Sequence, residues 1–521
     1  MTTERIFLST TIPYVNARPH LGHALEFVQA DVLARHARLA GNQVRFQTGT
    51  DDNSLKNVLA AEAEGIPAAE LVARNAAAFA GLREPLALSF DDFIRTSSDP
   101  RHPAGVERLW QACADGGDLY LKHYEGRYCV GCEQFYKPAE LAGGLCPEHG
   151  TEPQLVAEEN WFFRLSRYAD QLYDLISSGQ LRIEPAARRN EVLGFIAGGL
   201  EDFSASRSVS RAHGWGIPVP GDPDQVIYVW WDALGNYITA PGFGADAAGY
   251  RRWWAGADRR VHLVGKGVLR FHAVYWPAIL LSAGEPLPTD ILVHDYLTID
   301  GAKISKSGPV AAAADPAALA GRYGTDAVRW WLLREVPRVG DADFSQDRLI
   351  ARANDDLANG LGNLVSRVVT LVHRYRQGIV PEAGGPPGGP RHGSGGTGPG
   401  QNASGGLALA DAREQAQERV AAALAAFDFR AATAAVWAVV DEANRYTEQV
   451  EPWHLARAER AGDAGAGERL DEALALLAGT CADLGRLLEP FLPDLAARIR
   501  AACDGSSGRL PPAEPVFPRI G

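Results

Sequence analysis

Cysteine and long apolar runs are scarce in this sequence. Six cysteines in 521 residues are too few for a disulfide framework. No uninterrupted apolar stretch reaches the roughly 18 residues that a membrane-spanning helix needs. The first residues also lack the basic and then apolar order of a secretory signal. We therefore expect a cytoplasmic protein with no membrane partner.

Positive charge is also in deficit. Lysine and arginine number 51 against 64 acidic residues, for a net charge of −13. This argues against a nucleic-acid binder, because phosphate contacts need Lys and Arg, but it does not exclude a local basic face. The composition, 46% hydrophobic and 22% charged, is typical of a soluble globular protein. A chain of this length exceeds one hydrophobic core, so we expect about two to four domains.

The chain begins with a pattern typical of a βαβ unit. Residues 6–12 are β-branched or aromatic up to Pro13 and predict a strand. Residues 20–40 carry apolar side chains at helical spacing before Gly41, and residues 43–48 predict a second strand. Such a start indicates an α/β fold with a parallel sheet, whose ligands lie beyond the carboxyl ends of the strands. Further strands are expected at 226–230 and 262–264.

The rest of the chain divides by composition. Residues 98–221 are hard to place in a parallel sheet and are interpreted as an inserted domain. From residue 351 the chain is rich in Ala and Leu with helical periodicity. A segment crowded with Gly and Pro, about 381–406, interrupts this pattern and predicts a disordered loop.

Four metal-type ligands cluster in the predicted insert. They form two pairs, Cys129 with Cys132 and, after thirteen residues, Cys146 with His149. Three thiolates and one imidazole at such spacings favour a closed tetrahedral zinc site with no open position for catalysis. The alternative is four unrelated residues. The remaining thiols lie apart and are interpreted as ordinary buried cysteines: Cys113, Cys481 and Cys503.

Two short motifs suggest phosphate chemistry. In His20-Leu21-Gly22-His23 the histidines share one face of a helix start, which favours phosphate, and Gly22 leaves room for a nucleotide. In the segment 301–308, Lys303 and Lys306 would bring ammonium charge to a pyrophosphate leaving group. Each motif alone is also typical of surface histidines or of solvated lysines.

Taken together, the two motifs resemble the paired signatures of class I aminoacyl-tRNA synthetases. Flanking segments narrow the resemblance to the methionyl family: 160–166, 189–193, 216–223 and 270–278. The resemblance extends from Thr11 to Arg519. It implies ATP-dependent activation of L-methionine to methionyl-adenylate, transfer to the 3′ end of tRNA(Met), and Mg²⁺ accompanying the ATP.

The resemblance also implies a domain plan. A split Rossmann-type catalytic domain would comprise 1–97 and 222–295, with a connective domain and its structural zinc knuckle at 98–221. A linking domain with the lysine signature would follow at 296–350, and a helical anticodon-binding bundle at 351–521. The chain ends soon after this bundle, which favours a monomer.

Individual site residues are carried over from the same resemblance. The implied catalytic residues are His20, His23, Lys303 and Lys306, which would bind ATP together with Gly22. The implied methionine-binding residues are Ile12, Tyr14, Asp51, Trp230, Ala233, Leu234, Tyr237, His272 and Trp276. The implied anticodon-reading residues are Asn363, Arg367 and Trp453. Arg207 matches an arginine near the reacting centre. Without the resemblance, the tryptophans would be interpreted as core and the Asn/Arg pair as a solvated face.

Several positions depart from the usual family pattern. Asp52-Asn53-Ser54 stands where Glu-His-Gly is usual, Gly267 where Asp is frequent, and Ile304 where Met is usual. The segment 308–315 is also longer. We expect these changes to affect rate and inhibitor response more than the class of reaction.

Three alternatives stay open beside the main interpretation. They are a paralogue that makes an adenylate for another acceptor, an inhibitor-tolerant duplicate synthetase, and a non-catalytic RNA-binding relative. The retained anticodon-type residues argue against the first. The retained histidines and lysines argue against the last.

Overall fold

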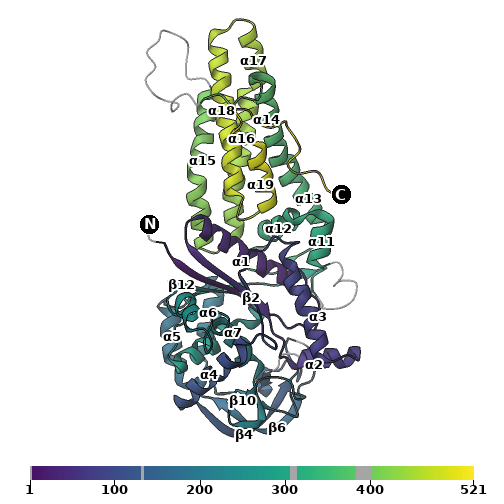
Figure 1. Cartoon of the computed structure of the whole chain (residues 1–521), viewed down its shortest axis with the longest axis vertical. Helices are drawn as coiled ribbons and strands as arrows, with labels where there is room; N and C mark the ends of the chain where they lie inside the picture. Colours follow the sequence, from purple (N-terminus) through teal and green to yellow (C-terminus); the bar gives the residue numbers. More distant parts are fainter. Residues whose placement is uncertain (1–2, 131–133, 149, 305–313, 383–400) are drawn as a thin grey trace. The chain divides into compact units, whose positions relative to one another are not determined.

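The computed structural model describes the chain except for residues 1–2, 131–133, 149, 305–313 and 383–400 (Figure 1). Contacts divide the chain into two compact units. The sheet unit comprises Met1–Glu84, Leu88–Tyr296 and Ile304–Asp315. The helical unit comprises Pro85–Ala87, Leu297–Lys303 and Pro316–Gly521. Each is described by itself below.

A six-stranded parallel sheet forms the centre of the sheet unit. Its order is β3-β2-β1-β12-β13-β7, and every neighbouring pair runs parallel. The strands are β1 (Arg5–Thr10), β2 (Gln43–Thr50), β3 (Asp92–Arg95), β7 (Arg182–Glu184), β12 (Arg259–Gly265) and β13 (Asp290–His294). The strand order reverses between β1 and β12. Ligands of such open sheets bind beyond the carboxyl ends of the strands at this reversal.

The predicted βαβ start is confirmed. α1 (Leu21–Leu39) connects the parallel strands β1 and β2 and buries Leu25, Val28 and Val32 at helical spacing. The chain leaves the helix through Gly41, whose φ of +84° suits glycine. β1 has five consecutive buried residues after Arg5 because both faces of a parallel sheet are covered.

Helices of the sheet unit pack around a core that contains the fully buried Trp231, Trp254 and Trp276. The α-helices are α2 (Leu55–Glu64), α3 (Ala68–Ala80), α4 (Arg101–Asp115), α5 (Ala169–Ser177), α6 (Ala186–Ala197), α7 (Val229–Thr239), α8 (Ala247–Tyr250) and α9 (Trp276–Ala283). Short 3₁₀ or π turns are η1 (Gly81–Arg83), η2 (Pro138–Glu140), η3 (Leu165–Tyr168), η4 (Arg251–Ala255), η5 (Lys266–Val268) and η6 (Phe271–Tyr275).

Antiparallel sheets occupy much of the predicted insert. One has the order β5-β4-β6-β8, with β4 (Leu119–Cys129), β5 (Gln134–Tyr136), β6 (Gln154–Phe163) and β8 (Phe203–Ser204). The other has the order β10-β11-β9, with β9 (Ser206–Ser208) and β10 (Pro218–Val219) in the insert and β11 (Asp222–Ile227) directly after it. The insert is nevertheless not separate from the parallel sheet, because β7 lies within 98–221 and pairs with β13.

The strand predicted at 226–230 is partly wrong. β11 ends at Ile227, and α7 begins at Val229. Nearly every residue of α7 is buried, so its sequence lacks the spacing of apolar and polar residues that marks a helix with one exposed face. A helix that is buried on every face, polar residues such as Asp232 and Asn236 included, cannot be distinguished from a buried strand by its apolar periodicity. The strand predicted at 262–264 is confirmed as part of β12.

The helical unit contains a small sheet and a set of long helices. β15-β14-β16 form the sheet, with β14 (Leu297–Ile299), β15 (Ala302–Lys303) and β16 (Ala342–Asp343). Figure 1 shows α14 (Asn363–Arg376), α15 (Gln401–Ala425), α16 (Phe429–Val450) and α18 (Ala464–Leu487) side by side. The other helices are α11 (Pro316–Tyr323), α12 (Thr325–Arg334), α13 (Gln346–Arg352), η7 (Ala353–Gly362), α17 (Pro452–Arg460) and α19 (Pro493–Ala502).

The disordered loop predicted at about 381–406 extends too far. Residues 383–400 lie outside the described part of the chain, but α15 already begins at Gln401. Gly405 packs so closely on α16 that a Cβ there would lie 2.4 Å from the Gln449 side chain. Packing against α16 therefore supports a helix that composition alone argues against.

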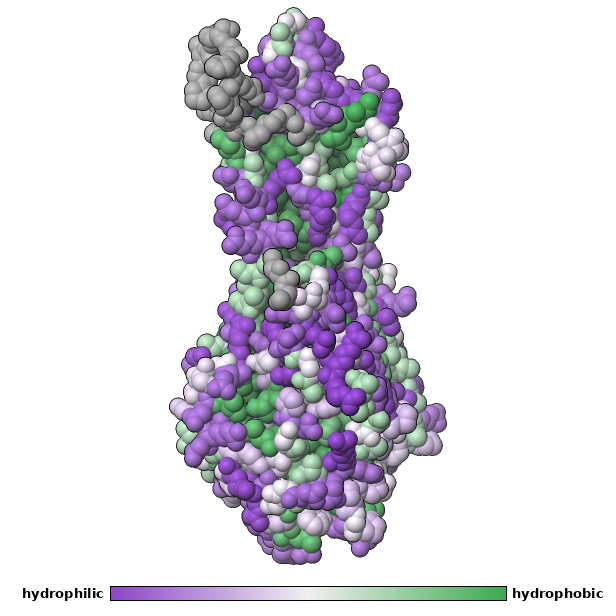
Figure 2. All heavy atoms as spheres, turned by 60° about the vertical axis from the view of Figure 1, so that its left-hand side comes forward, coloured by the Kyte–Doolittle hydropathy of each residue, from purple (hydrophilic) through white to green (hydrophobic). Residues whose placement is uncertain are grey.

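The surface is mostly polar where it is drawn. In Figure 2, hydrophilic residues cover most of the visible face, and hydrophobic residues reach it in separate patches. Among the described residues, no helix combines the length and the apolar character needed to cross a membrane.

Candidate functional site

His20 and His23 form one structural element at the start of α1. His20 is the N-cap, and its Nδ1 accepts the Gly22 N–H at 3.1 Å. His23 Nδ1 accepts the His20 N–H at 3.1 Å, and the two rings stack with centroids 3.9 Å apart. Because each Nδ1 is an acceptor, each neutral ring carries its hydrogen on Nε2. A Cβ on Gly22 would lie 2.9 Å from His20 Cε1, so glycine makes room for this ring.

The lysine signature is only partly within the described residues. Lys303 ends β15, and Lys306 lies outside the described part of the chain. Ala314, soon after that segment, is fully buried, and its carbonyl accepts the N–H of Leu21 at 3.0 Å. The chain that follows the lysine signature therefore contacts the first residue of α1, next to His20.

Glu26 connects strand ends on both sides of the point where strand order reverses. Its Oε1 accepts the Thr11 N–H and the Thr11 hydroxyl, each at 2.6 Å. Its Oε2 is 2.8 Å from His294 Nε2, at the end of β13. Burial acts to lower the pKa of His294, but the Glu26 carboxylate outweighs it and raises that pKa. Sequence reasoning missed both residues, and no local pattern distinguishes them.

Four predicted methionine-binding side chains, Trp230, Tyr237, His272 and Trp276, lie close together, and we call them the aromatic cluster. Tyr237 and Trp276 have ring centroids 6.0 Å apart, and Trp230 and His272 6.4 Å. The Tyr237 hydroxyl is 2.8 Å from His272 Nε2. His272 Nδ1 donates to the Val268 carbonyl at 2.9 Å, so Nε2 accepts from the tyrosine.

Burial keeps the polar members of the aromatic cluster neutral. It lowers the pKa of His272 to about 4 and raises that of Tyr237 well above its usual range. Ala233 and Leu234, from α7, are also buried. The cluster is therefore uncharged at neutral pH and mainly aromatic.

Three other predicted methionine-binding residues follow the strands β1 and β2. Ile12 and Tyr14 follow β1, and the Tyr14 ring meets Trp230 edge to face at 6.1 Å. Asp51 follows β2, is 1% exposed and forms an isolated parallel bridge with Tyr14. The structure thus brings Asp51 to Tyr14, and Tyr14 to the aromatic cluster.

His262 lies beside the aromatic cluster and was missed by sequence reasoning. Its ring centroid is 4.1 Å from that of Tyr237, and its Nδ1 is 2.6 Å from the Ser9 hydroxyl. The ring is fully buried, and burial, followed by the nearby His272, lowers its pKa well below the usual value. A lone histidine in a strand gives no sequence signal of this contact.

Asn53, one of the departures, belongs to a buried polar network. Its amide donates to Asp232 Oδ2 at 2.7 Å, and Asp232 Oδ1 is 2.5 Å from His102 Nε2. His102 Nδ1 is 2.8 Å from the Thr239 hydroxyl. This network joins the segment after β2 to α4 and α7.

Other departures have defined contacts as well. Asp52 pairs with Arg95 and accepts from Ser97, although its pKa is raised, chiefly by burial. Ser54 is the N-cap of α2 and accepts the Lys56 N–H. A Cβ on Gly267 would lie 2.1 Å from the Tyr296 hydroxyl, so this tyrosine occupies the space of a side chain. Ile304 is 5% exposed.

Arg207 lies in an aromatic environment. Its guanidinium is 4.1 Å from the Tyr228 ring centroid and 5.2 Å from that of Phe135. Its Nη1 donates to Ser204 and to the Ser206 carbonyl. Among the described residues these contacts place it within the antiparallel sheets of the insert.

Half of the predicted zinc site is described. Cys129 and Cys146 are each 1% exposed and belong to one small buried cluster with Tyr136. The Cys146 thiol donates to the Tyr136 hydroxyl at 3.8 Å. Cys132 and His149 lie outside the described residues. Within the part that is described, no three metal-type ligands come together.

The predicted anticodon residues lie on α14 and α17 of the helical unit. Asn363 begins α14 and is exposed, whereas Arg367 is half-buried and donates to Asn444 Oδ1 of α16 at 2.9 Å. Trp453 is half-buried near the start of α17, after Glu451 with its positive φ of 44°. Side chains for base contacts are thus available on two helices.

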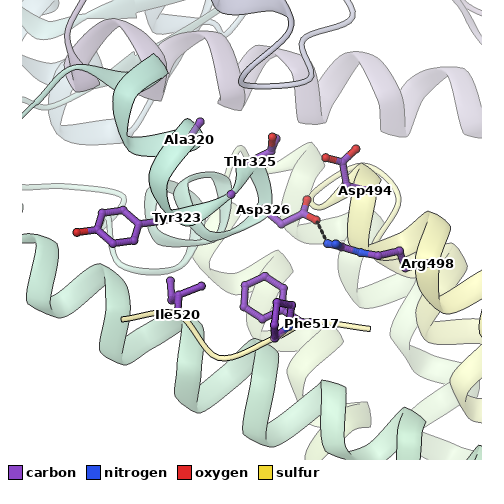
Figure 3. A pocket seen from close by; sticks show the side chains of 10 residues that line it. Ala320, Tyr323, Thr325, Asp326, Asp494, Arg498, Phe517 and Ile520 are labelled. Atoms are coloured by element: carbon purple, nitrogen blue, oxygen red, sulfur yellow. Dashed lines mark hydrogen bonds and ion pairs between the residues drawn. The ribbon is translucent and has the colours of Figure 1, made fainter. Parts of the chain in front are cut away.

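A separate cavity of about 250 Å³ lies within the helical unit (Figure 3). Asp326 and Arg498 are joined across it by an ion pair of 3.2 Å. Its other lining residues are Ala320, Tyr323, Gly324, Thr325, Asp494, Phe517, Pro518 and Ile520. None of the predicted site residues lines it.

Known proteins are similar to this chain over nearly its whole length. The family described as "tRNA synthetases class I (M)" matches residues 6–154 and 136–369. A methionine–tRNA ligase of Mycobacterium bovis is 39% identical over 533 residues, covering 98% of this chain and 97% of that protein. One from Brucella suis is 39% identical over 539 residues, covering 100% of this chain and 98% of that protein.

Solved structures are similar over the same extent. The Mycobacterium tuberculosis methionyl-tRNA synthetase in complex with methionyl-adenylate has a TM-score of 0.89 and 37% identity. The alignment covers 99% of this chain and 100% of that one. The apo form of the same enzyme has a TM-score of 0.82 and 35% identity, covering 99% of each chain.

Proposed function

The chain belongs to the class I tRNA synthetases of the methionine type, and we infer from this that it is a methionine–tRNA ligase. It activates L-methionine with ATP to methionyl-adenylate and transfers the methionyl group to tRNA. The observation that carries this conclusion is that Asp51, at the end of the parallel strand β2, lies at Tyr14, whose ring contacts the aromatic cluster. A similar solved structure holds methionyl-adenylate.

We propose that the aromatic cluster binds the methionine side chain. Its walls are neutral, because Tyr237 and His272 are both held uncharged by burial. A thioether gains about 0.3–1.5 kcal/mol from each sulfur–aromatic contact, so an aromatic site suits methionine. The Asp51 carboxylate would pair with the substrate ammonium.

ATP is proposed to lie at the start of α1. His20 and His23 would donate from Nε2 to phosphate oxygens, aided by the positive end of the helix. Lys306, with Lys303, would neutralise the departing pyrophosphate. Catalysis of this kind depends on position and charge, and one well-aimed donor contributes roughly 3–4 kcal/mol in the transition state. Mg²⁺ would bind through the phosphates of ATP.

The decisive experiment is amino-acid-dependent ATP–pyrophosphate exchange with all twenty amino acids. Methionine alone should support efficient exchange, with slight leakage, because shape discriminates near-isosteres by only about 1–3 kcal/mol. Leucine or isoleucine exchanging as well as methionine would contradict the proposed pocket. Charging of tRNA(Met) in the same preparation distinguishes a ligase from a paralogue that passes its adenylate to another acceptor.

A structural zinc ion is proposed for the insert. Cys129 and Cys146 are buried together and have the donor chemistry that zinc prefers, and Cys132 and His149 would complete the set. Bound zinc would supply folding energy rather than an open catalytic position. Metal analysis should find about one zinc per chain. Zinc content that is unchanged in Cys146→Ser would refute the assignment.

The helical unit is proposed to read the anticodon through Asn363, Arg367 and Trp453. Single-stranded bases are recognised by stacking on aromatic side chains and by hydrogen bonds at their edges. We also propose that the protein is a cytoplasmic monomer, in which segment 98–221 contributes β7 to the parallel sheet.

A further inference from the structure

Two cysteines that are distant in sequence lie opposite each other in the helical unit. Cys481 belongs to α18 and is fully buried, and Cys503 is the C-cap of α19 and is partly exposed. Both are free thiols. The sequence alone favours two unrelated buried cysteines, and only the tertiary structure relates them.

The packing register of α18 against α19 brings Cys481 and Cys503 to the same contact. α18 and α19 pack together, with Gly485 facing α19 so closely that a Cβ there would lie 3.0 Å from Arg500 Cγ. Arg500 Nη1 also donates to the Gly485 carbonyl at 3.3 Å. The helices run in opposite directions at this contact. Cys481 lies about one helical turn before Gly485 on α18, and Cys503 lies about one turn after Arg500 on α19. Because the helices are antiparallel, this register places Cys481 opposite Cys503.

The two thiols differ in reactivity. The neighbouring Cys481 lowers the pKa of Cys503, and the neighbouring Cys503, followed by burial, raises the pKa of Cys481. The thiolate is the reactive form of cysteine. The more exposed member of the pair is thus the better nucleophile, and the buried member is within its reach.

We propose that Cys481 and Cys503 form a reversible disulfide, with a low-molecular-weight disulfide such as glutathione disulfide as the oxidant. The Cys503 thiolate attacks one sulfur of the oxidant, forms a mixed disulfide and releases one thiolate. Cys481 gives its proton to that thiolate and attacks the Cys503 sulfur, which releases the second thiolate. Two protein thiols are oxidised and one small disulfide is reduced to two thiols, which carry the two protons.

The disulfide would act on the helical unit. It closes the α18–α19 connection, and the α19 end of that connection is already held by Asp326, which accepts the Leu495 N–H at 2.6 Å. A cross-link of this kind stabilises mainly by restricting the unfolded chain. The oxidised protein should therefore unfold its helical unit at a temperature several degrees higher, while ATP–pyrophosphate exchange stays unchanged.

The test uses the full-length, zinc-loaded protein incubated with glutathione disulfide and analysed by peptide mass spectrometry. The expected product is an internal Cys481–Cys503 peptide pair about 2 Da lighter than the two thiol peptides, reversed by dithiothreitol. Cys113 serves as an internal control, because burial raises its pKa to about 12 and it should stay reduced.

Two variants identify the roles of the thiols. In Cys481→Ser, Cys503 should accumulate as a mixed disulfide with glutathione, and the thermal shift should be absent. In Cys503→Ser, Cys481 should stay unmodified because it is buried. A parent protein that keeps both thiols reduced, or that retains a stable mixed disulfide on Cys503, overturns the proposal.

Discussion

The Tyr296 side chain occupies the space beside Gly267 that a larger residue would need. Any Cβ at this position would lie 2.1 Å from the Tyr296 hydroxyl, far closer than atoms normally approach. Gly267 is exposed and the clashing atom is the tip of a half-buried side chain, so Gly267→Ala should displace Tyr296 and destabilise the sheet unit by about 1 kcal/mol, the low end of the cost of overpacking. Urea unfolding followed by tryptophan fluorescence measures this change.

Gly265 provides a matched control for this prediction. A Cβ there would have its nearest contact, His294 Cε1, at 3.4 Å, so Gly265→Ala should be nearly neutral. Adding Tyr296→Phe to Gly267→Ala removes the hydroxyl and should restore part of the lost stability. Equal stability of Gly267→Ala and Gly265→Ala would show that Tyr296 does not restrict this position.

Buried histidines should make the stability of the sheet unit depend on pH. The pKa of His272 is lowered to about 4 and that of His262 lies well below its usual value, both chiefly through burial. The unfolded chain therefore binds protons that the folded chain does not. Their contribution to stability is complete above a pH of about 6.5 and is lost as pH falls towards 4, at up to about 1.4 kcal/mol per pH unit for each group.

His262→Asn should reduce the slope of unfolding free energy against pH by up to about 1.4 kcal/mol per pH unit, the effect of one proton. His213→Ala, at a side chain that is 42% exposed, provides a control for the replacement of a histidine at the surface. Denaturant unfolding at a series of pH values measures both slopes. An unchanged slope in His262→Asn would mean that this histidine is not held neutral.

At the scale of elements, α19 begins without a side-chain cap of its own. Its N-cap is Leu492, and Asp326 of α12 instead accepts the Leu495 N–H. Asp326 also pairs with Arg498 (Figure 3). Burial, followed by the nearby Asp494, raises the pKa of Asp326 to about 6. The folded chain thus holds a proton that the unfolded chain releases. Stability from this group is present below a pH of about 3.8 and is lost as pH rises through about 6.

Two substitutions of Asp326 distinguish its role as the acceptor for the Leu495 N–H of α19 from the titration of its carboxyl group. Asp326→Asn keeps an acceptor for Leu495 but removes the titration, so the helical unit should lose this pH dependence between about 4 and 6. Asp326→Ala removes the cap as well and should cost about 0.5–2 kcal/mol more. Circular dichroism of thermal unfolding, with hydrogen exchange at α19, measures both. A pH slope that is equal in Asp326→Asn and the parent would contradict the assigned titration.

At the scale of the whole molecule, the residues proposed for adenylation and for anticodon reading belong to different units. The proposed adenylation residues His20 and His23 belong to the sheet unit, and Trp453 belongs to the helical unit. Trp453→Ala should leave ATP–pyrophosphate exchange nearly unchanged. It should lower aminoacylation by roughly 5- to 150-fold, because one lost base stack is worth about 1–3 kcal/mol.

The neighbouring His454 gives a control for Trp453. Its side chain is 53% exposed and pairs with Glu451, so His454→Ala should change neither reaction greatly. His23→Ala should depress exchange itself. Normal charging by a folded Trp453→Ala protein would mean that the helical unit does not read the anticodon through this residue.

The sequence by itself determined the parts that depend on near neighbours in the chain. The periodicity of 20–40 predicted α1, the βαβ order predicted a parallel sheet, and the two signature motifs with their flanks indicated the family. These signals are local because helix and strand patterns repeat over a few residues and because a motif is contiguous. The residues that the resemblance assigns to methionine binding lie mostly close together in the structure.

Only the tertiary structure decided which distant residues meet. Glu26 and His294 are separated by 268 positions, and His102 and Asp232 by 130. Packing also placed β7 in the parallel sheet, extended α15 to Gln401 and brought Cys481 to Cys503. Such contacts follow from how elements pack, and packing satisfies buried polar groups with whichever partner the fold brings near. No pattern along the chain specifies that partner.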